Sequence, residues 1–551
     1  MLTLSNREQY GTLLDSATLH GHDDDTVLTF IGTTHAPQTI SRQLFKQRSV
    51  DYAQTLANAG ITPSDVVIIA HESILESMFV FWGALCLGAI PSMFPTLTEK
   101  LDPAVYQQQL ANLIRTSGAR AIITHNDFAS TFEPYTDCPI IRETVSTGVA
   151  VVTPTSPSAS DIAFLQHSSG TTGLQKGVAL SHEAVLNQLA SYSEAIDLQP
   201  DDVIVSWLPL YHDMGLIAGF LLPLVQGIPL VLMSPFDWVA HPALLLQTLH
   251  DYRGTLCWLP NFAYNHMARR IRKRDIGDLS LAHVRAFINC SEPVQAKSHA
   301  LFAERFSKHG IRPNQLAVSY AMAENTFAVT QTAIGDVPTV DSIDANILQS
   351  QQQAVATTDG MLYVSCGKPI AHTQVRVLDS DGNELGARLV GELVIKSDCM
   401  LTGYHNRHDL QAFTDDGWYF TGDMGYMSNG EVYIVGRKKD LIINAGKNVY
   451  PQDIEAIVNT ITGVHAGRCV VFGVHDERDG TELIAVLVER AIGSEVDDKD
   501  IKRAIRRVIA QQTTVSAQYV DIVPGGWLVK TSSGKIARDA NRDKWLQSRS
   551  T

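Results

Sequence analysis

The stretch Gly417–Glu455 reads GWYFTGDMGYMSNGEVYIVGRKKDLIINAGKNVYPQDIE and carries the clearest structural signal in the chain. At its centre Asn429-Gly430 lies between β-rich segments, and this pair predicts a two-residue hairpin turn in which both residues take positive φ. Pairing outward from the turn sets position 428 against 431 and position 423 against 436. Asp423 and the neighbouring Arg437 are therefore expected to meet at the open end of the hairpin.

A carboxylate beside a guanidinium can hold the vicinal hydroxyls of a ribose, and it can equally form a structural salt bridge. The spacing alone leaves both interpretations open. The surrounding order is TGD, then GRKKDLI, then an Asn/Gly/Lys turn and a proline before a helix that begins near Gln452. This order resembles the crossover between the large and small domains of the adenylate-forming superfamily. Its members include acyl-CoA synthetases, fatty acyl-AMP ligases, luciferases and peptide-synthetase adenylation domains.

The resemblance implies a large N-terminal AMP-binding domain at residues 1–437 and a small, mobile C-terminal lid at residues 438–551. Lys439 then stands at the hinge beside the nucleotide. Up to residue 330, apolar strands such as Asp65–Ala70 alternate with helices, which indicates parallel sheets covered by helices. A β-rich part follows from Met361 to Arg437, and the tail mixes helices and strands. The predicted fold class is therefore α/β, with parallel-rich sheets, a β-rich subdomain and a small α+β C-terminal domain.

Composition narrows the functional class. A chain of 551 residues is too long for one core, and 45% apolar with 18% charged residues is typical of a soluble enzyme. The formal charge of −15 argues against a general nucleic-acid binder, although it does not exclude a local basic patch. A protein this acidic that handles ATP must concentrate its cations locally.

Several features favour the cytoplasm. The amino terminus, MLTLSNREQYG, has neither a basic run nor an apolar core, so no secretory signal is expected. The seven cysteines are scattered without metal-ligand spacing, which is typical of reduced thiols. The apolar run Met214–Met233 is interrupted by Pro223, Gly227 and Pro229 and predicts a buried helix followed by a core strand, not a membrane span.

The loop His167–Gly177 follows a predicted strand. From Ser168 to Gly173 every residue is a glycine or a short hydroxyl, which suits a phosphate cradle of backbone N–H groups. Lys176 is preceded by Gln and followed by Gly, so the loop is not a Walker motif; a flexible surface loop is the alternative. The loop resembles the superfamily signature SGTTGxxKG. That resemblance implies contacts with the β- and γ-phosphates of ATP from Ser168, Ser169, Gly170, Thr171, Thr172, Gly173 and Lys176, with Thr171 also near Mg²⁺.

His212 lies in Trp207–Gly215, just before the long apolar run. A single histidine before such a helix is more often a core residue than a catalyst. The resemblance instead makes His212 a wall between the acyl pocket and the nucleotide. The apolar residues that follow, through Phe220 and Leu222, suit either the lining of a lipid tail or an ordinary core.

Two further segments match the superfamily. In Asn289–Pro293 the resemblance implies that Ser291 and Glu292 contact adenine, although Cys290 replaces the usual glycine. In Ser319–Glu324 it implies that Tyr320 stacks on adenine and that Glu324 helps to hold Mg²⁺. Ala321 stands beside the reacting carboxylate where glycine is common, which narrows the site slightly.

The last match is Lys530–Arg538, a basic Gly/Ser loop that in isolation is typical of a solvated tail. In the superfamily this loop carries the lysine that bridges the substrate carboxylate and the α-phosphate. A positive charge at that place lowers the barrier electrostatically, because negative charge gathers there during attack. The resemblance assigns this role to Lys535.

Together these motifs imply that a carboxylate attacks ATP to give an acyl-adenylate and pyrophosphate. Three features resemble fatty acyl-AMP ligases in particular. They are Met233–Phe236 with Tyr252–Thr255 and Pro260–Tyr264, then Asn448–Glu455, and a long polar interval that suggests an insertion around residues 332–363. In those ligases the insertion is thought to limit the domain motion needed for transfer to CoA; a neutral polar loop is the alternative.

The expected substrates are thus ATP with Mg²⁺, a medium- or long-chain fatty acid, and an acyl carrier protein whose phosphopantetheine thiol accepts the acyl group. An acyl-CoA synthetase and an inactive nucleotide- or acyl-binding relative remain alternatives. Neither nucleic acid nor integral membrane association is expected. The sequence leaves acyl chain length, pathway and oligomeric state open.

Overall fold

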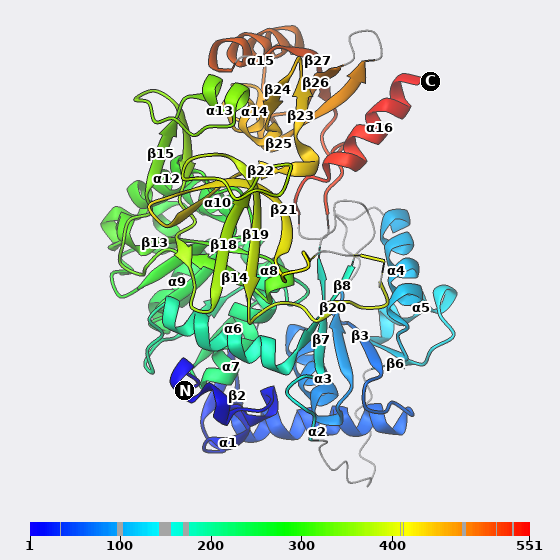
Figure 1. Cartoon of the computed structure of the whole chain (residues 1–551). Helices are drawn as coiled ribbons and strands as arrows, with labels where there is room; N and C mark the ends of the chain where they lie inside the picture. Colours follow the sequence, from blue (N-terminus) through cyan, green and yellow to red (C-terminus); the bar gives the residue numbers. More distant parts are fainter. Residues whose placement is uncertain are drawn as a thin grey trace.

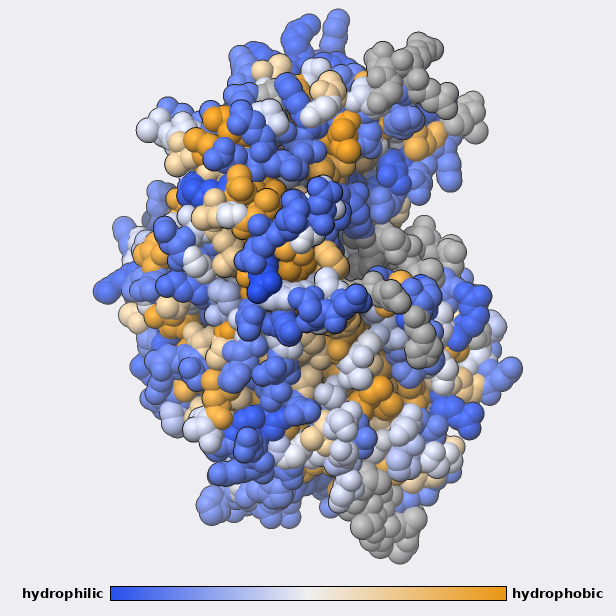
Figure 2. Space-filling view, viewed as in Figure 1, coloured by the Kyte–Doolittle hydropathy of each residue, from blue (hydrophilic) through white to orange (hydrophobic). Residues whose placement is uncertain are grey.

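A computed structural model describes residues 1–551 except 34, 96–102, 143–155, 169–175, 408, 411–412, 477–480, 514, 532–533 and 551. Two large mixed sheets form the body of the protein, and the C-terminal segment sits above them in Figure 1. Polar residues cover most of the face seen in Figure 2. Within the described ranges, no helix combines the length and apolar character needed to cross a bilayer.

The larger sheet has nine strands, and its central six are parallel. Antiparallel strands close both edges. In spatial order the strands are β17 (Lys368–Pro369), β14 (Ala328–Gln331), β13 (Leu316–Ala321), β12 (Ala286–Asn289), β11 (Leu256–Leu259), β9 (Ile204–Ser206), β10 (Leu230–Met233), β1 (Thr26–Ile31) and β2 (Gln38–Ser41).

The second sheet has seven strands, of which five are parallel. The predicted class, with parallel-rich sheets, is confirmed. In spatial order the strands are β20 (Gly403–Tyr404), β8 (Lys176–Ser181), β7 (Ile162–Ser168), β4 (Ile90–Met93), β3 (Val66–Ala70), β5 (Ala121–Thr124) and β6 (Ile140–Arg142).

Helices from both halves of the body meet in one apolar core. Trp82, on α3, packs edge-on against Phe45 of α2 and against Phe220. Gly83 permits this approach, because a Cβ there would lie 2.6 Å from the Ser49 carbonyl oxygen. The principal helices of the body are α2 (Arg42–Asn58), α3 (Ile74–Leu87), α4 (Pro103–Ser117), α6 (His182–Ala195), α8 (Pro235–Ala240), α9 (Ala243–Asp251), α10 (Asn261–Arg270), α11 (Lys273–Ile276) and α12 (Ala296–Phe306).

The run Met214–Met233 is a buried helical segment followed by a core strand, as predicted. Its first part, Met214–Leu221, is a π-helix, which the sequence did not indicate. It continues as α7 (Leu222–Gln226) and ends in β10. Gly215 lets the first turn approach the preceding loop, since a Cβ there would lie 2.2 Å from the Pro209 carbonyl oxygen.

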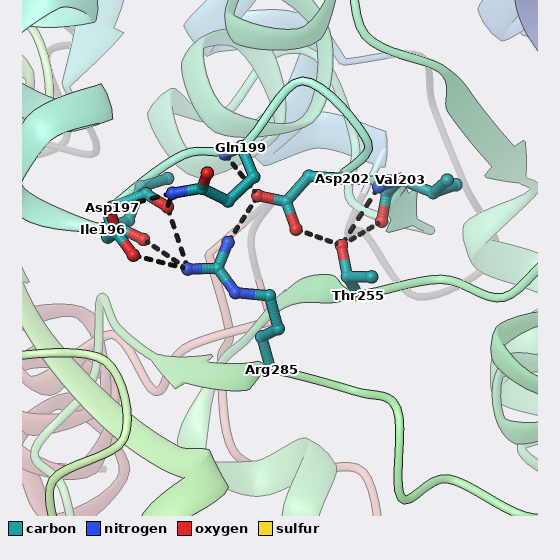
Figure 3. Close-up of polar contacts among 7 residues, drawn as sticks. All are labelled: Ile196, Asp197, Gln199, Asp202, Val203, Thr255 and Arg285. Carbon is teal, nitrogen blue, oxygen red and sulfur yellow. Dashed lines mark hydrogen bonds and ion pairs between the residues drawn. The ribbon is translucent and has the colours of Figure 1, made fainter.

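A buried polar cluster joins the amino ends of β9, β11 and β12 (Figure 3). Asp202 is 1% exposed; its Oδ2 pairs with Arg285 Nη1 at 2.5 Å, and its Oδ1 accepts the Thr255 hydroxyl at 2.6 Å. Removing one partner from such a buried pair typically costs about 3–5 kcal/mol, because the other charge stays buried. The cluster therefore fixes the three strands at the edge opposite their carboxyl ends.

The predicted hairpin is present in the four-stranded antiparallel sheet of β18 (Thr373–Leu378), β19 (Gly391–Ser397), β21 (Tyr419–Ser428) and β22 (Glu431–Arg437). Asn429 and Gly430 have φ of 53° and 78° and form the turn. The predicted register holds next to the turn but is wrong by one at the far end, where Asp423 pairs with Arg437 and not with residue 436. A β-bulge between Met424 and Gly425 causes this shift, since it places an extra residue in β22.

The long interval predicted around residues 332–363 is folded. It contains β15 (Val340–Ile343), α13 (Ala345–Gln351) and β16 (Met361–Val364), and β15 pairs with β16. Much of the interval is therefore regular structure and not irregular loop. Its apolar side chains share a cluster with residues from β21 and β22 and with Tyr450 of the C-terminal segment.

The C-terminal segment carries its own sheet, in the order β25 (Val464–Asp476), β26 (Thr481–Arg490) and β27 (Ala517–Val523). Helix α15 (Asp498–Gln512) buries Ile501, Ile505 and Ile509 at intervals of four, the spacing of one helix face. The remaining elements are β23 (Ile442–Asn444), β24 (Lys447–Val449), α14 (Pro451–Val458) and α16 (Arg538–Ser550).

A buried hydrogen bond joins the interval to this segment. The Tyr363 hydroxyl, on β16, donates to Asp453 Oδ2 on α14 at 3.0 Å. Burial raises the pKa of Asp453 to about 7; the hydrogen bond from Tyr363 opposes the rise, and the nearby Glu455 charge adds to it. The protonated carboxyl group is favoured in the folded protein, so its contribution to stability is greatest below about pH 4 and is lost as the pH rises from there to about 7.

We expect Asp453→Asn to remove this pH dependence, because the amide keeps an acceptor for Tyr363 and does not ionise. The melting temperatures of the two proteins should be similar at about pH 4, and the variant should melt a few degrees higher at about pH 8. Thermal unfolding across this range measures the difference. Asp381→Asn, at an exposed turn, is the control and should follow the wild type. A constant difference between wild type and Asp453→Asn at every pH would contradict the assignment.

Candidate functional site

The carboxyl ends of the parallel strands meet at one edge of the larger sheet, where open α/β sheets bind ligands. β9 leads into the loop of His212, β12 into Cys290-Ser291, and β13 into Glu324. These loops line one cavity of about 3640 Å³ together with parts of the C-terminal segment. Ligand sites usually measure about 300–1000 Å³. The cavity is therefore large enough for more than one substrate.

The expected site residues that the structure describes with their side chains all line this cavity. They are Lys176, His212, Ser291, Glu292, Tyr320, Ala321, Glu324, Asp423, Arg437, Lys439 and Lys535.

Asp423 connects the hairpin to β13. Its Oδ2 accepts the Tyr320 hydroxyl at 2.5 Å, and its Oδ1 pairs with Arg437 Nε at 2.9 Å. The Asp423 side chain is 5% exposed, whereas that of Arg437 is 54% exposed. The Asp423 charge raises the pKa of Arg437 further above its usual value. The site thus presents a fixed carboxylate and a partly free guanidinium, which suits a diol but is also a salt bridge in its own right.

Glu324 follows β13 and lies close to this group. Its Oε1 accepts the Tyr404 hydroxyl at 3.0 Å, and Tyr404 shares a second hydrogen bond with Tyr419 at 2.8 Å. Burial raises the pKa of Glu324 despite the hydrogen bond from Tyr404 and the nearby Arg437 and Lys176 charges. The Lys176 ammonium lies 4.9 Å from the Tyr404 ring centroid. Tyr404 therefore links Glu324 to Lys176.

Tyr404 and Tyr419 are site residues that the sequence patterns did not predict. Tyr404 ends the two-residue strand β20 and Tyr419 begins the ten-residue strand β21, and neither has a partner at a recognisable spacing. The pairing of β20 with β8 brings Tyr404 to the end of the phosphate loop. This pairing joins segments more than two hundred residues apart, which local patterns do not predict.

His212 and Asp213 form a close pair, with His212 Nδ1 2.5 Å from Asp213 Oδ1. Burial alone would raise the pKa of Asp213, but the charge and hydrogen bond of His212, the Lys535 charge and the hydrogen bond from the Met214 N–H together lower it. Lys535 therefore lies close enough for its charge to act on the His212 loop. The same charge acts on the buried Cys290 thiol. In this conformation the tail of the chain is folded over the carboxyl ends of the strands.

A tight turn presents Lys535. Its N–H donates to the Thr531 hydroxyl oxygen at 3.2 Å, and the Thr531 N–H donates to the Lys535 carbonyl at 2.8 Å. Gly534 completes the turn with φ of 83°. The loop is not a free tail, because Arg538 immediately after it is anchored to Asp440 at 2.5 Å.

Two more ion pairs fix this region. Arg538 Nη2 lies 2.8 Å from Glu455 Oε1, which belongs to α14. Lys439, at the expected hinge, lies 3.8 Å from Asp539. Burial lowers the pKa of Lys439, and the Asp440 and Asp539 charges partly oppose that change.

In the loop expected to contact adenine, the Glu292 side chain makes a hydrogen bond within the protein. Glu292 Oε2 accepts the Phe262 N–H at 3.0 Å, so the carboxylate caps the start of α10. The positive φ of this loop falls on Ser291, at 70°, and not on Cys290. Cys290 therefore occupies the usual glycine position without backbone strain.

The phosphate loop falls mostly outside the described residues. Ser169, Gly170, Thr171, Thr172 and Gly173 are not described, and Ser168 is described only as the end of β7. β7 and β8 are adjacent, with Ser168 opposite Lys176, so both ends of the loop lie at the cavity. Within the described ranges no cluster of three or more His, Cys, Asp or Glu side chains can hold a metal. A single carboxylate such as Glu324 is compatible with Mg²⁺, since this ion usually takes one or two carboxylates plus phosphates and water.

The sequence matches the AMP-binding enzyme family over residues 16–405. The chain therefore belongs to that family, and it is an enzyme with the adenylate-forming fold.

Two relatives and one solved structure indicate which members of the family this chain resembles. Long-chain-fatty-acid–AMP ligase FadD26 of Mycobacterium marinum is 30% identical over 557 residues, with 94% of each chain covered. The medium-chain fatty acid–acyl-carrier-protein ligase JamA of Moorena producens is 28% identical and covers 98% of this chain and 96% of its own. A structure from a study of fatty acyl-adenylate ligases of E. coli and L. pneumophila has a TM-score of 0.91 at 26% identity, covering 98% of this chain and 99% of its own.

We expect Asp423→Asn to weaken ATP binding about tenfold, a loss of about 1.4 kcal/mol. The amide loses the charge that holds Arg437 and turns an N–H donor toward it, so the guanidinium is no longer fixed. Calorimetric titration with ATP measures the affinity, and the exposed Asp381→Asn variant is the control. Unchanged ATP affinity in Asp423→Asn would limit this group to a structural salt bridge.

Proposed function

We propose that the protein activates a medium- or long-chain fatty acid with ATP and then transfers the acyl group to the phosphopantetheine thiol of an acyl carrier protein. The observation that carries this proposal is the presence of Lys535, Glu324 and the Asp423–Tyr320 pair on the walls of one cavity. The fatty acyl-AMP ligase names of the relatives support the same substrate class.

In the first step a carboxylate oxygen of the fatty acid attacks the α-phosphorus of ATP. The bond from this phosphorus to the bridging oxygen of the β-phosphate breaks, and pyrophosphate leaves. Asp423 and Arg437 hold the ribose, and Tyr320, Ser291 and Glu292 adjoin adenine. Mg²⁺, when bound at Glu324 and Thr171, neutralises part of the phosphate charge. The phosphates themselves are held by Lys176 and the loop from Ser168 to Gly173.

Lys535 supplies a positive charge where the attacking carboxylate and the α-phosphate come together. Its charge helps to lower the pKa of Asp213, the residue after His212, so the Lys535 side chain acts on this loop. His212 separates the nucleotide from the apolar part of the cavity, which Trp207, Leu208 and Pro209 line. That part suits the acyl chain.

In the second step the segment 438–551 turns about Lys439 and withdraws Lys535. The carrier-protein thiol then attacks the acyl carbonyl carbon, a thioester bond forms, the bond to AMP breaks, and the thiol proton passes to solvent. The Tyr363–Asp453 contact supports a restraint on this turn, and the name of JamA supports a carrier protein as the acceptor. The reaction would take place in the cytoplasm. Transfer to CoA is the alternative outcome.

We expect Lys535→Ala to lower fatty-acid-dependent ATP–pyrophosphate exchange by about 10²–10³-fold, the usual loss when one charge-stabilising group is removed. Because the side chain acts on developing charge, the fall should appear in kcat more than in the KM for ATP. Lys499→Ala, an exposed lysine on α15, is the control and should keep full exchange. Full exchange activity in Lys535→Ala would remove the catalytic role of this residue, and no exchange with any fatty acid in the wild type would remove the activity itself.

The acceptor is tested separately, by following thioester formation from the acyl-adenylate with a phosphopantetheinylated carrier protein and with CoA. We expect transfer to the carrier protein to be at least about tenfold faster. If Tyr363 restrains the turn, Tyr363→Phe should raise the rate with CoA while pyrophosphate exchange stays unchanged. CoA consumption that keeps pace with adenylate formation in the wild type would identify an acyl-CoA synthetase instead.

A further inference from the structure

An unusual basic run lies at the end of α10. Five of the six residues from Arg269 to Arg274 are Arg or Lys, in a chain with a formal charge of −15. All five side chains are exposed. Arg272 and Arg274 share one carboxylate, Asp275, at 3.3 and 3.8 Å. Arg269, Arg270 and Lys273 form no ion pair with any residue that the structure describes, so most of this positive charge is uncompensated.

Exposed apolar side chains adjoin the run. Phe236 and Val239 of α8 are 58% and 38% exposed, and Phe262 of α10 is 43% exposed. Trp238, buried between them, lies 6.0 Å from the Phe262 ring centroid and 5.4 Å from that of His266. The His266 ring nitrogen also bonds the Val239 carbonyl at 3.3 Å. The two helices therefore present these side chains on one surface.

The apolar and basic groups share a helix face. Phe262, His266 and Arg270 follow one another at intervals of four on α10, and residues at this spacing are neighbours on a helix surface. We call the combined area the α8–α10 surface. It consists of Phe236, Val239, Phe262, His266, Arg269 and Arg270. The basic run continues directly after the helix through the exposed Arg272, Lys273 and Arg274.

This surface is continuous with the cavity of the proposed reaction. Phe236, Val239 and Phe262 line the cavity, as do Arg269 and Arg270 at its rim. Trp207 joins them to the apolar wall, because its ring lies 3.7 Å from that of Trp238 in a stacked arrangement. An acyl chain that enters here would pass along apolar side chains from the surface to the reacting centre.

We propose that the α8–α10 surface docks on an anionic lipid surface, from which the fatty acid enters the cavity. The inference rests on the proposed function, because it names the source of that substrate. Aromatic and aliphatic side chains beside Lys and Arg suit the interfacial region of a bilayer. Each cation near an anionic surface contributes about 1 kcal/mol. The rest of the protein carries net negative charge, so electrostatic repulsion elsewhere orients this surface toward the lipid.

An acidic protein, such as a carrier protein, is the competing occupant. It would neutralise the cations, but exposed phenyl rings would then require a matching apolar pocket on the partner. The bilayer interface accepts rings and cations together without a matched shape. The position of the rings at the mouth of the cavity also fits the delivery of a chain better than the delivery of a thiol.

The test uses sedimentation of the full chain with vesicles of phosphatidylcholine, with and without about 30% phosphatidylserine. The wild type should bind only the anionic vesicles, and about 0.5 M salt should release it, because exposed charges are screened at that ionic strength. Replacing Arg272, Lys273 and Arg274 by Gln should weaken binding about 100-fold. These three residues do not line the cavity. The matched control replaces Arg503, Arg506 and Arg507, exposed on α15, by Gln and should bind as the wild type does.

Two further measurements complete the design. Phe236→Ser should weaken binding to the anionic vesicles without changing its salt dependence, since it removes an inserted ring and no charge. Pyrophosphate exchange with a short, water-soluble fatty acid should be equal in the wild type and the triple Gln variant, which separates docking from catalysis.

Failure of the wild type to bind anionic vesicles while exchange remains intact would overturn the lipid inference and leave the proposed function standing. Equal vesicle binding by the wild type and the triple Gln variant would overturn it too. If the triple change instead abolished capture of a phosphopantetheinylated carrier protein and left vesicle binding unchanged, the surface would belong to the carrier protein.

Discussion

The arrangement of the site depends on two ion pairs, which the Arg538 guanidinium forms with Asp440 and Glu455. Asp440 follows the hinge position, Glu455 lies on α14, and Arg538 comes three residues after Lys535. The two carboxylates therefore fix the lysine loop to the framework of the C-terminal segment. Both the ion pairs and the Arg538 side chain are largely shielded from solvent, so water and salt weaken them less than surface pairs. Lys535 is consequently placed by a rigid support and not by a flexible tail.

The wall of the cavity formed by the larger sheet is held by a separate set of polar contacts. The parallel strands end together at the cavity, and their amino ends are tied by Asp202, Thr255 and Arg285. Such polar anchoring at one edge leaves the loops at the other edge free to carry ligand-binding residues. The site is thus formed where the anchored sheet edge meets the loop that carries Lys535, and the proposed hinge at Lys439 adjoins that loop through Asp539.

Local patterns predicted much of this structure because the relevant forces are local. The Asn429-Gly430 turn follows from backbone φ preferences, and the elements of the C-terminal segment follow from apolar periodicity. The one-residue error at Asp423 arose from a bulge, which depends on how β21 twists against its neighbours. Tyr404 was missed because its partners, Glu324 and Lys176, are brought to it by the pairing of distant strands. The folding of the 332–363 interval was also missed, since its few apolar residues find partners only in β21, β22 and Tyr450.

Helix α14 makes two contacts that the proposed turn of the C-terminal segment would affect differently. Glu455 faces Arg538 and moves with the lysine loop, because both belong to the same segment. Asp453, on the same helix, bonds Tyr363 of the body. A turn of the segment about Lys439 would therefore keep the first contact and break the second. Withdrawal of Lys535 and loss of the Tyr363 hydrogen bond would be a single event. One such bond contributes about 1 kcal/mol, so with the surrounding apolar contacts it can bias the turn without preventing it.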